Sequence, residues 1–328
     1  VSLAQLGAPL IAAAREGIAE HCQDFALVAH DWSRLNYNSH ASKHDRLRMT
    51  HATDVGHELH SSLVIGDQQG EPLSPVAQNL ATATELLSTY RSPAPGAAAD
   101  SRLTHLDELS ERLRWLDAQA LGKPLVHIID READSVAHLR QWAAAGHHWL
   151  IRAKGCSRVR ADQKDLRLDV VAQSLSYQSV RTIEHKGVPC RQWVGESTVV
   201  LARPARSKRK DADGVRVKPQ AGEPLWVRLV VSRIEDEAGQ VLAVWYLLCQ
   251  VPASVEAAQI AQWYYFRWRI ESFFKLLKQG GQQLERWEQE SGLAIFKRLL
   301  IASQACVLTW RVMHASGEAA AQTQQFLV

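Results

Sequence analysis

The spacing of hydrophobic and polar positions changes several times along the chain, and each change marks an expected element. Residues 3–21 and 102–119 carry apolar side chains at helical spacing, and two strand-like runs within residues 60–82 are joined by a turn with Gly and Pro. Short apolar runs typical of buried strands occupy residues 25–31, 124–130 and 149–155. This order of strands and helices predicts an α/β fold with a mixed sheet and flanking helices.

The second half of the chain changes character at about residue 156. Residues 156–250 contain β-branched runs between polar turns, which predicts a mostly β insertion. Helical patterns return at 263–280 and at 293–314, and the second of these is apolar enough to be a buried helix. We therefore expect the following domain boundaries: a core formed by residues 1–155 and 251–315, the β-rich insertion 156–250, and a frayed tail 316–328.

Net charge and cysteine content exclude few classes of protein. The formal net charge of +3 over 328 residues is too small to indicate a nucleic-acid binder, so DNA binding must rest on local patches. The basic run at 201–219 is either a solvated loop or a contact for the DNA backbone. The five cysteines are scattered without any CxxC pair, which favours free thiols in a reducing cytosol.

The ends of the chain and its apolar runs bear on localisation. No apolar run approaches the roughly 20 residues that span a bilayer, and no signal-peptide pattern opens the sequence. We expect an intracellular protein with no membrane contact. The sequence starts at Val1 without a methionine, so we also expect a fragment.

The helix expected at 263–280 presents two distinct faces. An arc of about 60° holds a phenol, two cations and a carboxylate, which are Tyr264, Arg267, Glu271 and Lys278. Apolar side chains on the neighbouring face would dock on a core. The polar arc fits either an internal salt-bridge row or a metal-ligating acid beside a phosphate clamp.

Two further acids follow apolar strand patterns. Asp31 and Asp130 each close a short apolar run, and with Glu271 they make a candidate triad for two Mg²⁺ ions. Each Asp alone is more typical of a residue that caps the following helix or turn, so the candidate site rests on all three acids together. Asp45, Asp54 and Asp67 are rivals for the first acid, but none of them ends an apolar strand.

Residues 32–58 are polar, and histidines accumulate in and just after them. The metal-ligating residue types here are His40, His44, His51, His57 and His60 with Asp54 and Glu58. Their spacings match no zinc pattern, and a mobile or DNA-facing polar segment explains them more simply.

Three motifs resemble those of one protein family. The spacing Tyr-x2-Arg-x3-Glu-x6-Lys at 264–278 resembles the YREK signature of bacterial cut-and-paste transposases of the insertion-sequence-four family. HIIDREAD at 127–134 is similar to the DREAD box of this family, and DWSRLNY at 31–37 is similar, less closely, to the segment that carries its first acid.

The resemblance implies a ribonuclease-H-like core with a β insertion before the last catalytic helix. It implies that Asp31, Asp130 and Glu271 bind Mg²⁺ or Mn²⁺, nick the transposon end with water, and lead through a DNA hairpin to strand transfer. It implies that Tyr264, Arg267 and Lys278 bind a DNA phosphate. A base flipped out of the DNA would stack on Trp245, and Trp268 would fill the space that this base leaves. Arg152 and Lys154 would contact the DNA of the transposon end.

The resemblance also implies partners and a location. The partners are double-stranded DNA with terminal inverted repeats and a second copy of the full-length protein in a synaptic complex, and the location is the bacterial cytoplasm at the nucleoid. Two alternatives stay open: a transposase-derived remnant that binds DNA without cutting it, and a ribonuclease-H-like nuclease of other purpose.

Overall fold

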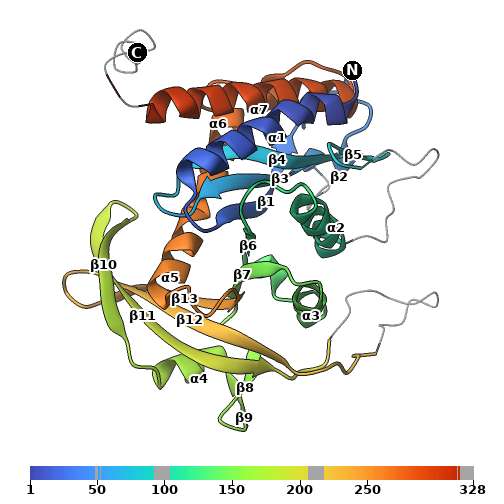
Figure 1. Ribbon diagram of the computed structural model, residues 1–328. Coiled ribbons are helices and arrows are strands. Elements are labelled where there is room, and N and C mark those ends of the chain that lie inside the picture. Colours follow the sequence, from blue (N-terminus) through green and yellow to red (C-terminus); the bar gives the residue numbers. More distant parts are fainter. Residues whose placement is uncertain (49–50, 52, 92–103, 206–217, 316, 318–328) are drawn as a thin grey trace. The chain divides into compact units, whose positions relative to one another are not determined.

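The computed structural model describes residues 1–48, 51, 53–91, 104–205, 218–315 and 317 (Figure 1). Most of the predicted basic run and nearly all of the predicted frayed tail lie outside the described residues. The chain forms two compact units, and each is described by itself. Unit 1 contains Val1–Leu125 and Phe266–Val328, and unit 2 contains Val126–Tyr265.

The sheet of unit 1 is antiparallel. Its strands lie in the order β5 (Leu86–Ser88), β4 (Pro72–Ala81), β3 (Val55–Gly66) and β1 (Ala26–Asn36), and the short β2 (Leu47–Arg48) also pairs with β3. The hairpin predicted within residues 60–82 is confirmed as β3 and β4. Strand β3 is buried over nearly all its length because β1 and β4 pair with its edges and α1 and α6 pack against it.

Strand β1 is longer than the sequence predicts. The apolar run ends at Asp31, but the strand continues to Asn36 because β3 pairs with it through to the Asn36–Gly56 pair. Residues Ala26 to His30 are all buried, and partial exposure begins at Asp31. Asp31 therefore marks the end of the buried part of β1 and not the end of the strand.

The described part of unit 1 contains the helices α1 (Leu3–His21), α2 (His105–Asp117), α6 (Trp268–Lys278) and α7 (Gly292–His314), with a short 3-10 turn η2 (Leu284–Arg286). Helices α1 and α7 lie side by side over β4, whereas α6 packs on β1 and β3 (Figure 1). The predicted helices at 3–21 and 293–314 are confirmed. Ser2 caps α1 and Thr104 caps α2, each with a reciprocal side-chain bond to the third helical residue.

The single helix predicted at 263–280 is divided. Helix α5 (Ala257–Phe266) ends before Arg267, and α6 begins after it. Arg267 keeps helical dihedral angles, but the Ile270 amide bonds to the Arg267 carbonyl, which tightens this turn to 3-10 geometry. The apolar face of α6 is buried as predicted, through Ile270, Phe273 and Leu277.

Gly70, in the turn between β3 and β4, packs closely against Phe266 and Arg269 at the junction of α5 and α6. Gly70 has φ +72°, a Cβ added there would lie 2.3 Å from the Phe266 ring, and its carbonyl accepts a bond from Arg269 Nε at 2.8 Å. We expect Gly70→Ala to destabilise the protein by about 2–4 kcal/mol in urea unfolding, because left-handed strain adds to the clash. Gly239→Ala is the matched control, since Gly239 has φ +79° with open space around it. A loss no larger than in the control would contradict the clash.

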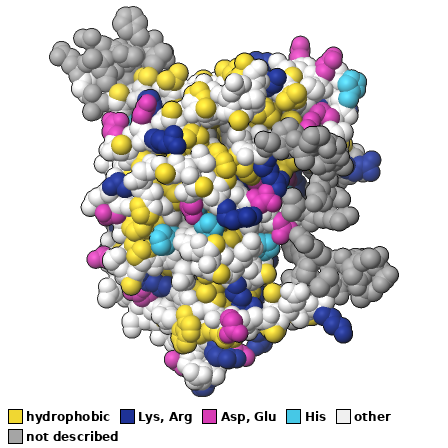
Figure 2. All heavy atoms as spheres, turned by 45° about the vertical axis from the view of Figure 1, so that its right-hand side comes forward, with side chains coloured by type: hydrophobic (Ala, Val, Ile, Leu, Met, Phe, Trp, Pro, Cys, Tyr) yellow, Lys and Arg dark blue, Asp and Glu magenta, His cyan; other side chains and the backbone are white. Residues whose placement is uncertain are grey.

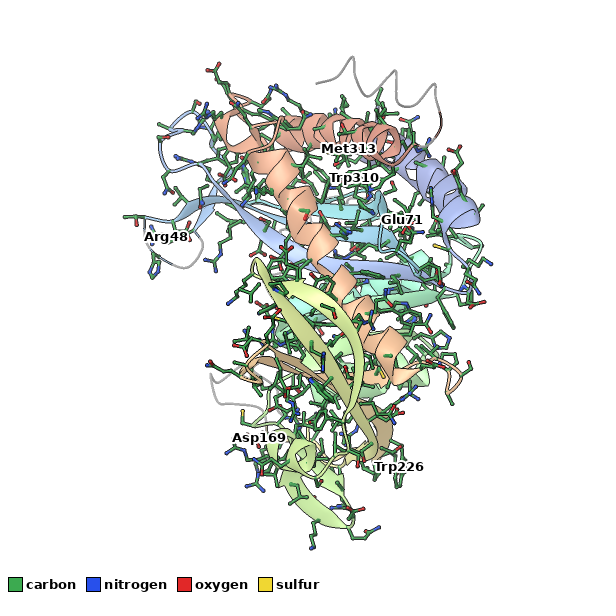
Figure 3. The ribbon with its side chains drawn as sticks, turned by 90° about the vertical axis from the view of Figure 1, so that its left-hand side faces the viewer. Arg48, Glu71, Asp169, Trp226, Trp310 and Met313 are labelled. Carbon is green, nitrogen blue, oxygen red and sulfur yellow. The ribbon has the colours of Figure 1, made fainter. Side chains whose placement is uncertain are left out.

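Helix α7 corrects one prediction from the sequence. It has 23 residues with a mean hydropathy of 1.4 over its most apolar 18-residue window, so an apolar run of membrane-spanning length does exist among the described residues. Half of that window is buried, and α7 packs against β4, α1 and α6. In Figure 3 Trp310 and Met313 are labelled on α7; Trp310 is buried against Phe273 and Met313 is exposed. One such helix is weak evidence for a membrane span, because core helices meet the same criterion.

Unit 2 contains a mixed sheet. Its strands lie in the order β6 (Leu125–Ile129), β7 (His148–Ala153), β13 (Val241–Gln250), β12 (Leu225–Glu235), β11 (Val188–Leu201), β8 (Arg158–Ala161) and β9 (Lys164–Arg167), and β10 (Gln178–His185) also pairs with β11. Strands β6 and β7 are parallel, and the other pairs are antiparallel. The helices are α5, the 3-10 turn η1 (Arg131–Ala133), α3 (Val136–Ala144) and α4 (Leu168–Gln173). The predicted α/β class with a mixed sheet is confirmed.

Surface chemistry agrees with the small net charge. On the face shown in Figure 2, basic, acidic and hydrophobic side chains of the described residues are interspersed. All five cysteines are free, and only Cys156 is exposed. Burial raises the pKa of the Cys249 thiol to about 12, so this cysteine stays protonated and unreactive at neutral pH.

Candidate active site

In unit 1, Asp31 and Glu271 bind the same guanidinium. Arg267 donates from Nη1 to Asp31 Oδ2 at 3.0 Å and from Nη2 to Glu271 Oε1 at 2.6 Å. Asp31 Oδ1 accepts a bond from the Trp32 amide at 2.9 Å, which fixes the orientation of the carboxylate. Residues 236 positions apart, on β1 and at the start of α6, are thereby brought to one point in unit 1.

Local structure explains how these side chains meet. Arg267 and Glu271 are four residues apart, so they lie on one side of the helical turn that opens α6. Glu271 is also in the first turn of α6, where the helix dipole favours a carboxylate. The buried residues Ile270 and Phe273 hold α6 on β1 and β3, so Glu271 has little freedom to move away from Asp31.

Burial differs between the cation and the two acids. The Arg267 side chain is 7% exposed, whereas those of Asp31 and Glu271 are 25% and 35% exposed. Two partly exposed carboxylates thus share one buried guanidinium. The predicted salt-bridge row is thus present at Arg267 and Glu271, and Asp31 extends it.

In unit 2, Asp130 and Tyr264 form a second polar group. Asp130 follows β6 directly, as predicted, and its Oδ1 accepts from the Arg131 amide at 2.6 Å and from the Tyr264 hydroxyl at 3.0 Å. The first bond makes Asp130 the N-cap of η1. The capping role weighed for Asp130 from the sequence is therefore present.

The two tryptophans singled out from the sequence differ in exposure. Trp245 on β13 is 6% exposed, with its ring centroid 5.4 Å from that of Tyr264. Trp268 is 55% exposed, and the Arg267 guanidinium lies 5.9 Å from its ring centroid. Trp245 is thus part of an aromatic cluster in unit 2, whereas Trp268 offers an open ring face in unit 1.

The remaining predicted DNA contacts are basic. Lys278 Nζ donates to the Arg34 carbonyl and lies 3.6 Å from Glu285. Arg152 is partly exposed on β7, and Lys154 is exposed just after this strand. Arg152 and Lys154 are two positions apart, so they project to the same side of the extended chain.

The rival acids have structural partners in unit 1. Asp67 accepts from the backbone amides of Gln23, Asp24 and Phe25 at 2.9–3.1 Å. Asp45 accepts from the Gly292 amide at 2.7 Å and therefore caps the start of α7. Asp54 lies 3.6 Å from Arg34. Each rival thus has a role in joining segments of unit 1, whereas Asp31 binds the cation that also binds Glu271.

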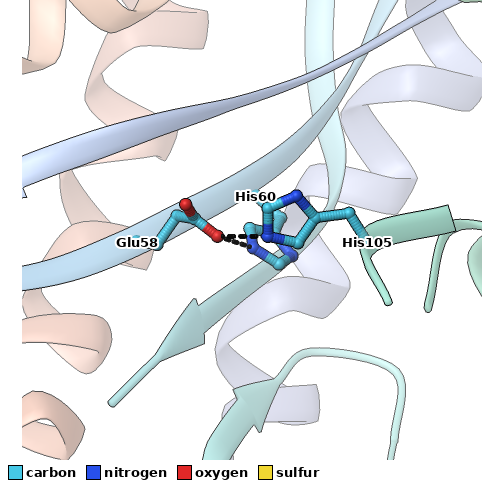
Figure 4. Close-up of side chains that lie close together, drawn as sticks. All are labelled: Glu58, His60 and His105. Carbon is cyan, nitrogen blue, oxygen red and sulfur yellow. Dashed lines mark hydrogen bonds and ion pairs between the residues drawn. The ribbon is translucent and has the colours of Figure 1, made fainter. Parts of the chain in front are cut away.

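A second cluster of titratable groups in unit 1 joins Glu58 and His60, which were set aside as metal ligands from the sequence, to His105, which was not singled out there. Glu58 Oε1 lies 2.8 Å from Nε2 of His60 and 2.8 Å from Nε2 of His105 (Figure 4). Burial alone would raise the pKa of the Glu58 carboxyl, but bonds from His105 and His60 outweigh it and hold the pKa well below its usual range. The Glu58-x-His60 spacing on a strand is a signal for one shared face, whereas His105 comes from a distant helix.

Comparison with known proteins identifies the family of this chain. Unit 1 is an antiparallel sheet flanked by helices, and its Asp31 and Glu271 both bind Arg267. Residues 80–310, more than half of the chain, match the model of the transposase DDE domain family. The chain belongs to this family. The matched segment contains Asp130 and Glu271 and begins after Asp31.

The chain is also similar to a solved structure of low sequence identity. That structure is a piggyBac transposase, determined by cryo-electron microscopy as a synaptic complex with hairpin DNA, at 8% identity and a TM-score of 0.37. The match covers 89% of this chain and 48% of the other, so the chain spans about half the length of that protein.

Proposed function

We propose that this chain is the catalytic core of a metal-dependent DNA transposase that hydrolyses phosphodiester bonds at transposon ends and transfers the freed strand. The main observation that supports the proposal is that Arg267 donates hydrogen bonds to both Asp31 and Glu271. Family membership supplies the reaction class. We further propose the ribonuclease-H-like fold and the insertion-sequence-four subtype, which rest on the YREK and DREAD motifs.

The donor atoms fit a hard divalent cation. Asp31, Asp130 and Glu271 offer only carboxylate oxygens, the ligands that Mg²⁺ and Mn²⁺ prefer. Arg267 already demonstrates that Asp31 and Glu271 can share one cationic partner in unit 1. Bound ions, two in this proposal, would stabilise the charge on the attacking and leaving oxygens of the phosphodiester.

The other side chains would bind and orient DNA. In this proposal Arg267, Lys278 and Tyr264 contact a backbone phosphate, since a guanidinium, an ammonium and a phenol all donate hydrogen bonds. Trp245 and Trp268 serve an extruded base during hairpin formation. Arg152 and Lys154 contact end DNA. The partners are DNA with terminal inverted repeats and a second copy of the full-length protein, at the bacterial nucleoid.

A second candidate has its own support. The ion pairs of Arg267 with both acids are also those of a permanent structural salt bridge, which favours a transposase-derived protein that binds DNA without cutting it. The two candidates differ in one respect: cleavage requires Asp31 as a ligand, whereas binding does not.

The test is nicking of a plasmid that carries the gene's own flanking DNA, with Mg²⁺ or Mn²⁺. We expect nicking by the unaltered chain and a loss of at least about 100-fold in Asp31→Asn, because an amide is a much weaker ligand for a hard cation. Asp54→Asn is the matched control, since Asp54 is a strand-flanking acid of unit 1 that pairs only with surface Arg34 among the interactions described. Nicking that survives in Asp31→Asn would remove Asp31 from the mechanism, and DNA binding without any nicking would favour the second candidate.

A further inference from the structure

The cluster of Glu58, His60 and His105 has the donor set of a transition-metal site. Glu58 and His60 are two residues apart on β3 and therefore project from one face of the sheet, and His105 is the first residue of α2. One atom from each lies within 4.8 Å of the others, and Figure 4 shows both imidazoles directed at one Glu58 oxygen. Two imidazole nitrogens and a carboxylate oxygen are a ligand set that Zn²⁺ takes in proteins.

The backbone that carries these ligands is fixed on both sides. Strand β3 is paired in register with β1 and β4, so Glu58 and His60 cannot shift independently. At the other side, the Thr104 side chain accepts from the Asp107 amide at 3.3 Å, and this cap defines where α2 begins. His105 is thereby held at the helix end that faces β3.

A second carboxylate orients His60 from behind. Glu108 Oε2 lies 3.2 Å from His60 Nδ1, so Nδ1 can keep its proton on Glu108, and loss of the Nε2 proton then leaves the Nε2 lone pair available to a cation. Glu108 is itself held by Arg112 at 2.7 Å, by Asn79 at 2.6 Å and by the Tyr90 hydroxyl. A carboxylate on the far nitrogen is the usual support of a metal-binding histidine, because it fixes the ring and raises its basicity.

Exposure gives the cluster a path to solvent. The His60 and Glu58 side chains are 5% and 14% exposed, whereas that of His105 is 44% exposed. The centroid of the Trp32 ring lies 4.8 Å from that of His105 and 6.4 Å from that of His60. A cation would therefore enter on the His105 side, and a solvent molecule can complete its coordination there.

We propose that Glu58, His60 and His105 bind one Zn²⁺-type cation, at a site separate from the acids Asp31 and Glu271. The chemistry of the donors separates the two sites: nitrogen ligands favour Zn²⁺ or Co²⁺ over Mg²⁺, whereas a site made only of carboxylates favours Mg²⁺ or Mn²⁺. Tetrahedral ligands at Zn²⁺ distances lie about 3.3 Å apart, so the 2.8 Å contacts need to open by only about half an ångström. On binding, each imidazole gives up its Nε2 proton to solvent and presents the lone pair to the cation. The bound ion would clamp α2 to β3.

The experiment uses the untagged full chain with Zn²⁺ and Co²⁺ as probes. We expect calorimetry to show that one Zn²⁺ binds per chain and that a large excess of Mg²⁺ does not displace it. Bound Co²⁺ should absorb visible light intensely, as four- or five-coordinate Co²⁺ does. Zn²⁺ should also raise the Tm of the chain. His105→Gln should weaken Zn²⁺ binding at least about tenfold and remove the Tm increase, with the fold intact because His105 is the most exposed ligand. Glu58→Gln is a second variant with the same expectation.

Two controls make the outcome decisive. His44→Gln removes an exposed histidine of unit 1 that is not in the cluster, and Asp31→Asn removes an acid of the candidate active site; neither should change Zn²⁺ binding. Absence of Zn²⁺ binding, equal binding by His105→Gln and the unaltered chain, or an equal loss in His44→Gln would overturn the proposal. The cluster would then be an ion-pair network that joins α2 to β3 without a metal.

Discussion

Replacing Glu271 with glutamine is expected to reduce metal-dependent DNA nicking by at least about 1,000-fold, which corresponds to roughly 4 kcal/mol of transition-state stabilisation. The change removes one anionic ligand and keeps the shape of the side chain. Arg267 retains its bond to Asp31, so α6 stays docked through its buried residues. DNA binding should stay within about twofold, because phosphate contacts come from cations.

Nicking and DNA binding are measured on the same DNA, with circular dichroism to verify the fold. Glu288→Gln is the matched control, since Glu288 is an exposed glutamate of unit 1 outside the cluster. Unchanged nicking in Glu271→Gln would refute the catalytic assignment. A lower Tm together with unchanged nicking would identify the Arg267–Glu271 pair as structural only.

Replacing Glu108 with glutamine is expected to destabilise the folded chain by about 3–5 kcal/mol, because it leaves the buried Arg112 without its anionic partner. Arg112 is 0% exposed and its guanidinium binds Glu108 and Ser62. Burial raises the pKa of the Glu108 carboxyl, but Arg112 and His60 outweigh this and hold the pKa below its usual range. The contribution of Glu108 to the free energy of unfolding is therefore fully present above its unfolded-state pKa of about 4.3. This contribution is lost as the pH falls toward the lower folded-state pKa.

Urea unfolding at neutral pH measures this effect. Glu111→Gln is the matched control on the same helix, because Glu111 pairs with Arg91 at a partly exposed position and should cost less than about 1 kcal/mol. If the free energy of unfolding falls by the same amount in both variants, burial does not make the ion pair of Glu108 with Arg112 stronger than the partly exposed pair of Glu111 with Arg91.

Local periodicity was sufficient to predict some features of each unit. The helical spacing of Arg267 and Glu271 predicts their contact, since residues four apart on a helix are neighbours. The buried strand before Asp130 predicts the position of that acid at a strand end. Such features depend on a few adjacent residues, which the sequence displays directly.

Features that depend on pairing partners were not predictable. The extension of β1 past Asp31 follows from its pairing with β3, because the polar residues after Asp31 show no strand pattern by themselves. The division of the long helix at Arg267 has no Pro or Gly to signal it. The convergence of His105 on Glu58 joins a helix to a strand 47 positions earlier, and no spacing rule covers such a distance.

The alternation of side chains along β1 links the two clusters of unit 1. Asp31 reaches Arg267 at the start of α6, and the next residue, Trp32, packs on His105 of α2, so consecutive residues serve opposite faces of one sheet. Inserting or deleting a single residue before Asp31 would exchange these faces and displace both groups at once. Natural length variation should therefore be tolerated in the turns that flank this strand and excluded from its centre.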